Sequence, residues 1–367
     1  MCDVGFNHIE RLDLGDRAAR MLAVMDYGEY RDKCVLVTGG LGFIGSNLVI
    51  RLIELGARVT VVDSLAPGCG GNRENLEPFI GAVQIKLADI SEVESFAKEI
   101  QRPDLIFNVA GAVSHSGSME APLRDLELNT HAQLVFLSKC ADRFPGVRIV
   151  YAGTRQVYGV PNFLPVTEDH PIAPVDFNGV HKFAASSYHL LLSKLGRLDA
   201  VVLRLTNVYG PHMALNVKGQ GLLTVYIRNA LAHQPIEIYG NGKQLRDPVH
   251  VSDVVDAFLS AGVTFSKSRV FNISGPEPLQ VRQIAKIAAA AGHCEIIWRE
   301  FGALEKAIDI GSYRAEASRV RGELKWRPRT RFEQGFAETL GSYDPSRRVS
   351  CGEQPAGMFG IPAAEVL

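Results

Sequence analysis

The sequence predicts an α/β fold in which a doubly wound parallel sheet is combined with a smaller mixed α/β C-terminal domain. From residue 34 to about residue 210, apolar runs of strand length alternate with stretches of helical pattern. This alternation is typical of a parallel sheet that helices cover on both faces. A glycine-spaced turn after the first run and an aspartate at the end of the second support the same architecture.

A turn with three glycines, each three residues from the next, joins the first expected strand, 34–38, to a helix expected over 47–55. In such a turn one glycine makes the bend, one lets a pyrophosphate approach the backbone, and one lets the helix pack close to the strand. The N–H groups at the helix N-terminus then favour the phosphates. We therefore expect a Rossmann-type domain whose turn binds a dinucleotide through Gly39, Gly42, Phe43, Ile44 and Gly45.

The second expected strand, 58–63, ends in Asp63. An acidic residue at this distance from the glycines binds the adenosine ribose of a dinucleotide. No arginine directly follows Asp63, so NAD is favoured over NADP as the cofactor. Further strands of the same sheet are expected at 83–88, 104–110, 147–152 and 200–207.

The pattern changes after Pro211, where short strands and helices intermix. The pair Asn241-Gly242 is typical of a hairpin turn. Near the start of the chain, a short amphipathic helix is expected at 17–25. The other elements expected after Pro211 are helices at 219–232, 251–261 and 281–291 and strands at 236–239 and 270–274.

The chain divides into an extension, two intermixed domains and a tail. Its 367 residues are enough for a sizeable core. The final stretch lacks periodicity and holds glycine and proline, which is typical of a loose terminus. We expect an N-terminal extension at 1–32, an NAD-binding domain at 33–211 that also receives roughly 247–275, a substrate domain at 212–246 and 276–345, and a tail at 346–367.

Composition argues against several classes of function. The formal net charge is −1, so nothing favours binding to nucleic acid or to a membrane surface. No apolar stretch is long enough to span a bilayer, and charged residues near the start are unlike a signal peptide, so a cytoplasmic protein is expected. The six cysteines are scattered without metal-ligand spacing, which predicts reduced thiols and no metal site.

Seven segments, taken in order, match one known pattern: 38–45, 87–90, 108–111, 158–159, 204–211, 240–247 and 322–328. The chain thereby resembles the extended short-chain dehydrogenase/reductase family, in its nucleotide-sugar epimerase and dehydratase branch, which includes UDP-glucose 4-epimerase. The resemblance runs from about residue 34 to residue 340. It implies a tightly bound NAD, a nucleotide-diphosphate sugar as substrate, and a cofactor site that also contains Asp89, Ile90, Val109, Ala110, Gly111 and Lys182.

The resemblance also implies which residues hold the diphosphate of the sugar nucleotide. Asn207 and Arg246 fall at those positions, and the forked guanidinium suits a diphosphate. Lys218 precedes a helix start and is a further candidate for phosphate contact. The alternatives are a turn-capping Asn207, an ion pair between Arg246 and Asp247, and a solvated Lys218.

The catalytic motif lacks one member. The family oxidises a sugar carbon, usually C4, with a tyrosine that a lysine four residues later supports, and a serine or threonine binds the same hydroxyl. Thr154 and Lys182 match two of these positions, but Asn178 stands where the tyrosine is expected. An amide is not a base near neutral pH. The usual proton carrier is therefore absent.

Three explanations remain open. In the first, another residue carries the proton: His115 follows the fourth strand and could face the sugar, while His181 titrates in the right range and adjoins Lys182. In the second, Lys182 works through a water held by Asn178 and Thr154. In the third, the protein binds its nucleotide ligands without redox chemistry. Further candidates for the first explanation are Tyr151, Tyr158 and Asp176.

The residues after Thr154 bear on the type of reaction. Related 4,6-dehydratases have an Asp-Glu pair there, where this chain has Arg155 and Gln156, and neither can serve as that acid and base. The glutamate expected of a sugar-acid decarboxylase is also missing. Epimerisation at C4 is the predicted reaction, with net oxidation or reduction of the sugar as the alternative. Arg155 is expected to hold a carboxylate or hydroxyl of the substrate, or to form a salt bridge at the domain junction.

A homodimer is expected. The resemblance implies pairing through the helices near 123–140 and 182–193, which carry more apolar residues than one core-facing stripe needs. Burial of these residues under the chain's own C-terminal domain is the alternative. The residues concerned are Leu126, Leu134, Val135, Leu137, Leu190, Leu191 and Leu192.

Overall fold

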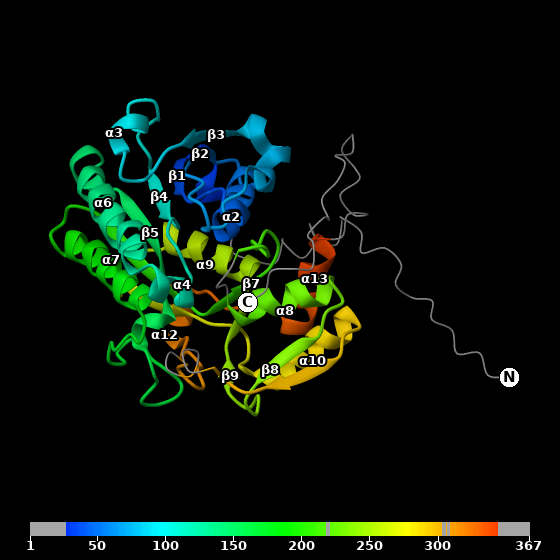
Figure 1. Ribbon diagram of the computed structural model, residues 1–367. Coiled ribbons are helices and arrows are strands. Elements are labelled where there is room, and N and C mark those ends of the chain that lie inside the picture. The colour runs from blue at the N-terminus through cyan, green and yellow to red at the C-terminus, as the bar shows by residue number, and fades with distance from the viewer. Residues whose placement is uncertain (1–26, 218–220, 303–305, 307–308, 344–367) are drawn as a thin grey trace.

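The computed structural model places a parallel sheet at the centre of the molecule, with α8, α10 and α13 gathered at one end of it (Figure 1). The helix expected at 17–25, Lys218 and the expected tail lie outside the described residues. The described residues are 27–217, 221–302, 306 and 309–343.

The central sheet has seven strands in the order β11-β6-β5-β4-β1-β2-β3. All of its neighbouring strands pair in parallel, as the sequence predicts. The strand order reverses between β1 and β4, and ligands of open α/β sheets bind at the carboxyl ends of the strands beside such a reversal. The strands are β1 (Cys34–Thr38), β2 (Arg58–Asp63), β3 (Val83–Leu87), β4 (Leu105–Asn108), β5 (Arg148–Thr154), β6 (Asp199–Leu205) and β11 (Val270–Ile273).

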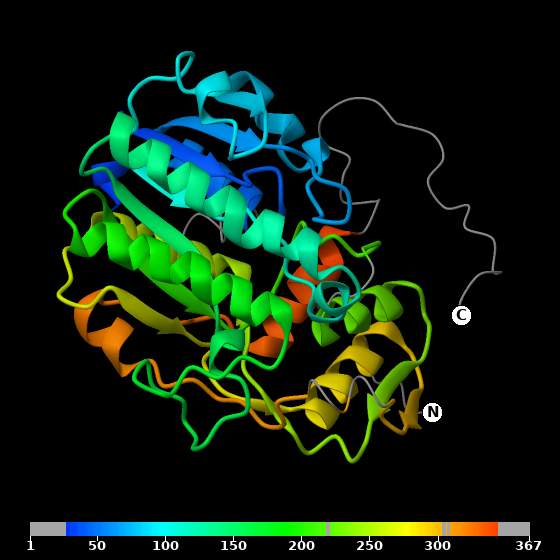
Figure 2. The same ribbon diagram turned by 60° about the vertical axis from the view of Figure 1, so that its left-hand side comes forward.

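Helices cover both faces of this sheet. On one face α2 (Phe43–Glu54) and α9 (Val251–Val263) pack on Val37 of β1, and on the other α6 (Ala132–Arg143) packs on its neighbour Leu36. Figure 2 shows α6 and α7 (Phe177–Lys194) side by side on that second face. Successive residues of the strand therefore enter different cores, which explains why the strand is apolar throughout.

The glycine turn has the geometry that its spacing predicts. Gly39 has a φ of +68°, and a side chain there would bring Cβ to 2.8 Å from the Cα of Ala110. A Cβ on Gly45 would lie 2.1 Å from the carbonyl oxygen of Gly39. The helix begins at Phe43, four residues before the predicted start, because Gly42 already serves as its N-cap.

The part of the chain after β6 builds three two-stranded sheets. They pair β7 (Asn207–Tyr209) with β10 (Pro248–His250), β8 (Ile236–Tyr239) with β13 (Ile296–Arg299), and β9 (Leu245–Arg246) with β12 (Leu279–Gln280). The helices of this part are α8 (Leu222–Leu231), α10 (Val281–Gly292), α12 (Ser318–Glu323) and α13 (Phe332–Ser342).

The predicted hairpin at Asn241-Gly242 is wrong. A turn is present, with Gly240 and Gly242 both at positive φ, but the strands before and after it pair with other partners. The reason is tertiary: Ile236 and Ile238 of β8 are buried in one core with α8 and α10, and this packing places β8 beside β13.

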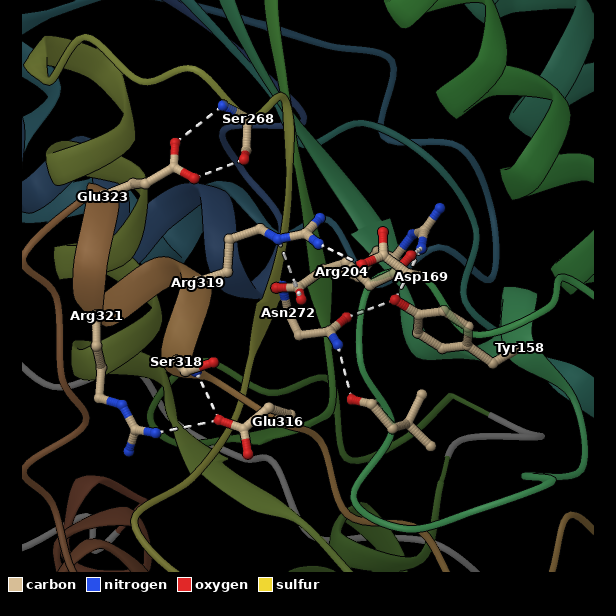
Figure 3. Close-up of polar contacts among 12 residues, drawn as sticks. Tyr158, Asp169, Arg204, Ser268, Asn272, Glu316, Ser318, Arg319, Arg321 and Glu323 are labelled. Atoms are coloured by element: carbon tan, nitrogen blue, oxygen red, sulfur yellow. Dashed lines mark hydrogen bonds and ion pairs between the residues drawn. The ribbon is translucent and has the colours of Figure 1, made fainter.

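Polar contacts attach α12 to the edge of the main sheet (Figure 3). Glu323 accepts hydrogen bonds from the Ser268 hydroxyl at 2.6 Å and from its backbone N–H at 2.9 Å. Arg319 contacts Asp169 at 2.8 Å, on the segment that follows β5. These contacts hold the C-terminal segment against the NAD-binding region. The shorter helices are η1 (Gly28–Tyr30), η2 (Arg73–Ala82), α3 (Val93–Phe96), α4 (His115–Glu120), α5 (Pro122–Leu126), η3 (Glu127–His131) and η4 (Arg155–Tyr158).

Candidate active site

The candidate cofactor site lies where the glycine turn meets the ends of β2 and β4. The N-cap of α2 is a glycine without a capping side chain, so the first N–H groups of this helix suit a phosphate. The carboxylate of Asp63 accepts backbone hydrogen bonds from Leu41 at 3.0 Å and Leu65 at 2.8 Å, and burial raises its pKa. Its remaining lone pairs can still accept ribose hydroxyls. These groups fit a dinucleotide such as NAD.

The other predicted cofactor residues border the same region. Asp89 caps the turn after β3, accepting from the N–H of Ser91 at 2.8 Å and from its hydroxyl at 2.6 Å. Ile90 is buried, and the backbone N–H of Val109 donates to Thr38 of β1 at 3.2 Å. The segment 108–111 therefore runs beside the glycine turn, as the resemblance implies.

Lys182 lies directly behind this segment. A Cβ on Gly111 would be 2.8 Å from its Nζ, and the ammonium lies 5.3 Å from the centre of the Tyr151 ring. Burial lowers the pKa of Lys182 to about 8, while the charge of Asp125 opposes this shift. Lys182 forms no ion pair among the described residues, since the nearby Asp125 pairs with His181 instead. Its charge therefore lies unpaired next to the cofactor site.

Asn178 is held in place by both hydrogens of its amide. Nδ2 donates to the carbonyl oxygen of Ala112 at 3.0 Å and to Asp125 at 2.9 Å. The other carboxylate oxygen of Asp125 meets Nδ1 of His181 at 2.7 Å. Asp125 therefore joins Asn178 to His181, and His181 is committed to this buried contact.

Asp125 has no motif that marks it in the sequence, and its role follows only from the packing of α5 on α7. Asn129, in the π-helical turn η3, was missed in the same way. Its Oδ1 accepts from the backbone N–H of Ala112 at 3.0 Å, and its Nδ2 is buried with no partner among the described residues. Such π-turns often occur at functional sites.

His115 has the arrangement of a positioned base. Its Nδ1 donates to Asp176 across 2.5 Å, because a carboxylate can only accept. In the neutral imidazole Nε2 is then an acceptor. Nε2 contacts the side-chain amide of Gln156. The imidazole is partly exposed, at 34 % of the side chain, whereas the Asp176 side chain is 1 % exposed.

Asp176 is fixed from two sides. It is the N-cap of α7, where Oδ1 accepts from the backbone N–H of Gly179 at 2.7 Å. Burial alone would raise the pKa of Asp176, but the hydrogen bond and charge of His115 outweigh burial and hold this pKa below its ordinary value. Asp176 therefore remains an acceptor that orients the imidazole.

Thr154 ends β5 and belongs to the same group. Its hydroxyl accepts from the backbone N–H of Gln156 at 3.2 Å, and the Gln156 side chain in turn reaches His115. The structure thus brings Thr154, Gln156, His115 and Asp176 together. The sequence indicates only that Gln156 cannot be a base. It contains no signal for the contact between Gln156 and His115.

The two candidate tyrosines do not fit a proton carrier. Tyr151 is fully buried and stacks on His189 with ring centres 4.2 Å apart. The hydroxyl of Tyr158 donates to Asn272 and accepts from Arg204, each at 2.7 Å, in the core cluster of Figure 3. Burial raises the pKa of both phenols further above neutral.

Asn207 lies on β7 and Arg246 lies on β9, two short strands that belong to different sheets. Asn207 has a buried Oδ1 without a partner among the described residues. Arg246 contacts Asp309 at 3.3 Å, and its Nη1 donates to the carbonyl oxygen of Gly311 at 2.6 Å. The expected alternative partner, Asp247, instead accepts from the backbone of Gly275 and Ala315.

Arg155 is buried, with 7 % of its surface exposed. Its guanidinium lies over the ring of Tyr313, 4.9 Å from the ring centre. Burial first and the nearby charge of Arg246 second lower the pKa of Arg155 to about 10. The alternative role, a salt bridge at the domain junction, finds no partner at ion-pair distance among the described residues.

Other kinds of site have no support in the described part of the chain. No group of three or more histidine, cysteine or acidic side chains there could hold a metal ion. The described cysteines, Cys34, Cys69, Cys140 and Cys294, form no disulfide. No described helix is long and apolar enough to cross a bilayer. A hollow of about 430 Å³ lies at the amino ends of β1 to β3, away from the glycine turn.

Comparison with known proteins identifies the family. The model of the NAD dependent epimerase/dehydratase family matches residues 35–274. UDP-glucose 4-epimerase of Mycolicibacterium smegmatis is 32 % identical over 312 residues, which cover 83 % of this chain and 96 % of that protein. The chain therefore belongs to the NAD-dependent epimerase/dehydratase family of enzymes, and the predictions of the family, the parallel α/β fold and NAD as cofactor are confirmed.

Two solved structures show the same fold. The UDP-glucose 4-epimerase of Thermotoga maritima, solved with UDP-glucose, is 28 % identical with a TM-score of 0.77, and the match covers 86 % of this chain and all of that one. The UDP-glucose 4-epimerase of Thermus thermophilus, solved with NAD, is 28 % identical with a TM-score of 0.75. That match covers 84 % of this chain and 98 % of the other.

Proposed function

We propose that the protein is a nucleotide-sugar epimerase that transiently oxidises a sugar carbon, C4, and that His115 carries the proton in place of the family tyrosine. The observation that carries this proposal is the chain of contacts from Asp176 through His115 to Gln156, next to Thr154. The similarity to UDP-glucose 4-epimerases supports the reaction type.

His115 meets the requirements of a general base. Asp176 holds its Nδ1–H, so Nε2 has the free lone pair that accepts a proton from the reacting hydroxyl. That hydroxyl takes the place of the Gln156 amide on Nε2 and is also bound by Thr154. NAD, when held by the glycine turn and Asp63, would supply the hydride chemistry that removes and restores the hydrogen on the sugar carbon. The same imidazole then gives its proton back.

Lys182 and Asn178 support this chemistry without being the base. The charge of Lys182 lies next to Gly111 under the cofactor and favours an anionic reacting oxygen. Asn178 has a structural role, since its amide hydrogens bind Ala112 and Asp125. His181 is engaged by Asp125 and keeps a structural role in this proposal.

The diphosphate of the substrate is assigned to Asn207 and Arg246. In this assignment Asn207 donates from its amide nitrogen to a phosphate oxygen. Its buried Oδ1, which has no partner among the described residues, is an acceptor and does not itself contact the diphosphate. The guanidinium of Arg246 now contacts Asp309. In this proposal it binds phosphate oxygens in place of that carboxylate when the substrate is present. Lys218 remains a predicted phosphate contact outside the described residues.

The protein is further proposed to be a homodimer through α6 and α7. On these helices and the adjoining α5, some large apolar side chains face solvent. Of the residues predicted for this interface, Leu137 is instead fully buried in the core, and Leu190 and Leu192 pack against core residues. Leu123 is 79 % exposed and Leu191 is 54 % exposed. The others are Leu126, Leu134, Val180 and Phe183.

The reaction is tested by NMR of the purified protein with UDP-, GDP-, dTDP- and CDP-sugars in D2O, with absorbance as a monitor of reduced cofactor. A new epimer without solvent deuterium is the expected result. Deuterium at a carbon next to the ketone would contradict simple hydride return at one carbon. A stoichiometric nicotinamide signal would show net redox. Absence of turnover with NAD bound would favour a non-catalytic nucleotide-binding protein.

A further inference from the structure

Two buried polar groups next to the proposed reacting site lack a partner within the described part of the chain. They are Nη1 of Arg155 and the hydroxyl of Tyr313, and neither forms a hydrogen bond there. Arg155 lies over the Tyr313 ring, so the two groups belong to one site. Buried polar atoms are nearly always paired, and an unpaired buried charge is costly. Such a pair of groups indicates a ligand that completes it.

The ligand must be an acceptor and carry negative charge. Arg155 offers only donors, and Tyr313 has a free O–H. Among the described residues, Asp247 and Asp176 act on Arg155 through their charge, and neither forms an ion pair with it. The carboxylate of Asp247 accepts hydrogen bonds from the backbone N–H groups of Gly275 and Ala315. A carboxylate of the substrate would supply both the charge and the geometry that a guanidinium fork matches.

The position of Arg155 places this carboxylate on the sugar. Arg155 follows Thr154 directly, and its other neighbour in the chain, Gln156, reaches His115. The charge of Arg246 also acts on Arg155. Arg155 therefore lies near both the proposed reacting hydroxyl and the proposed diphosphate contact. In a nucleotide sugar, this is the position of the hexose ring.

We infer that Arg155 and Tyr313 form a subsite for a carboxylate, so that the substrate is a nucleotide-linked acidic sugar and not a neutral hexose. This inference rests on the proposed function, because it takes the ligand to be a nucleotide sugar. The carboxylate is either that of a hexuronic acid or that of a carboxyl-bearing substituent joined to the sugar ring by an ether bond. Both sources present the same group to the guanidinium.

The test measures binding by calorimetry to the NAD-loaded protein. UDP, dTDP, GDP and CDP are titrated first, and the nucleotide that binds then defines matched pairs: its glucose and glucuronic acid derivatives, and its N-acetylglucosamine and N-acetylmuramic acid derivatives. We expect one acidic member to bind about 10- to 100-fold more tightly than its neutral counterpart, which is the range for a hydrogen-bonded charge pair. The pair that shows the preference identifies the source of the carboxylate.

Two variants separate this subsite from the diphosphate contact. In Arg155→Met the preference is lost, while affinity for the neutral sugar is kept, and removal of an unpaired buried charge should not impair folding. Arg246→Met is the matched control, and it weakens acidic and neutral members equally. Arg155→Lys retains the charge but loses the fork, so part of the preference remains.

The outcomes distinguish the two proposals. If neutral and acidic sugars bind equally, or if the preference survives in Arg155→Met, the carboxylate subsite is wrong while the proposed function stands. If no nucleotide and no nucleotide sugar binds, the proposed function is wrong and the subsite with it. Circular dichroism spectra of the variants confirm that each loss arises in a folded protein.

Discussion

At the scale of single residues, the proposed site uses the imidazole of His115 where the family uses a phenol. The carboxylate of Asp176 is buried, caps a long helix and binds the N–H of His115, so the imidazole is fixed in the tautomer that a base needs. Asn178 occupies the place of the lost tyrosine with an amide whose hydrogens are both used. The two changes are consistent with a site that has been rebuilt around a different proton carrier.

His115→Gln is expected to lower kcat about 10²- to 10⁴-fold, the usual contribution of a general base, because an amide cannot accept the proton. NAD binding and stability should change little, since the side chain is partly exposed. Turnover of the sugar found by NMR is the measurement. His131→Gln is the matched control, because this imidazole also pairs with a carboxylate but lies on the surface of η3. Equal activity of the two variants would contradict the assignment of His115.

Lys182 makes stability depend on pH in a defined direction. Its pKa is about 8 in the folded protein and 10.5 ordinarily, because burial disfavours the charge. Between these values the unfolded chain binds the proton more tightly, so stability rises with pH in this window. Urea unfolding should show this rise, of up to about 1.4 kcal/mol per pH unit, relative to Lys182→Met. Parallel pH profiles of the two proteins would show that Lys182 does not titrate there.

At the scale of elements, the glycine turn and the π-helical turn decide how closely the segments approach. Backbone of Val109 and Ala110 lies where a side chain of Gly39 would be, and the backbone of Gly39 lies where a side chain of Gly45 would be. At Gly111 a side chain would instead meet the side-chain ends of Lys182 and Asn129. The turn itself is therefore held together by contacts between backbones, which tolerate no added carbon.

Gly39→Ala should destabilise the fold by more than the cost of its backbone conformation. Gly39 and Gly146 have similar φ values, +68° and +73°, and that conformation costs an alanine about 1–2 kcal/mol. At Gly39 the new Cβ also meets Ala110 at 2.8 Å, whereas at Gly146 nothing lies within 4 Å. Urea unfolding and NAD affinity are the measurements. Equal destabilisation by Gly39→Ala and Gly146→Ala would rule out the clash.

At the scale of the whole molecule, the exposed apolar residues of α6 and α7 support the proposed dimer. These helices cover the sheet on that side (Figure 2). Leu134 of α6 and Val180, Phe183 and Leu191 of α7 nevertheless remain exposed. In a protein whose formal charge is close to zero, such a face favours association.

Leu191→Glu is expected to convert the dimer to monomers, because it places a charge in the proposed interface. Sedimentation equilibrium at micromolar concentration measures the mass. The control is Phe265→Glu, since Phe265 is also exposed, at 80 %, but lies in the connection between α9 and β11. A wild-type protein that sediments as a monomer, or a dimer that survives Leu191→Glu, would exclude this interface.

Local pattern was sufficient for the sheet and the cofactor turn. The strands of the central sheet, Asp63 at the end of β2 and the glycines could be predicted because a doubly covered strand is apolar throughout and because only glycine fits the turn. The hairpin at Asn241-Gly242 failed because the pairing of β8 depends on the core formed with α8 and α10. That core is made by residues distant in sequence.

What the sequence determined by itself is therefore the family, the parallel sheet and the absence of the catalytic tyrosine, since each depends on neighbouring residues. Only the tertiary structure decided which side chains lie together around His115 and Asn178. His115 lies 61 positions from Asp176, and Asn178 lies 53 positions from Asp125. The packing of α4 and α5 against α7 brings these partners within hydrogen-bond distance, and such contacts leave no periodic pattern along the chain.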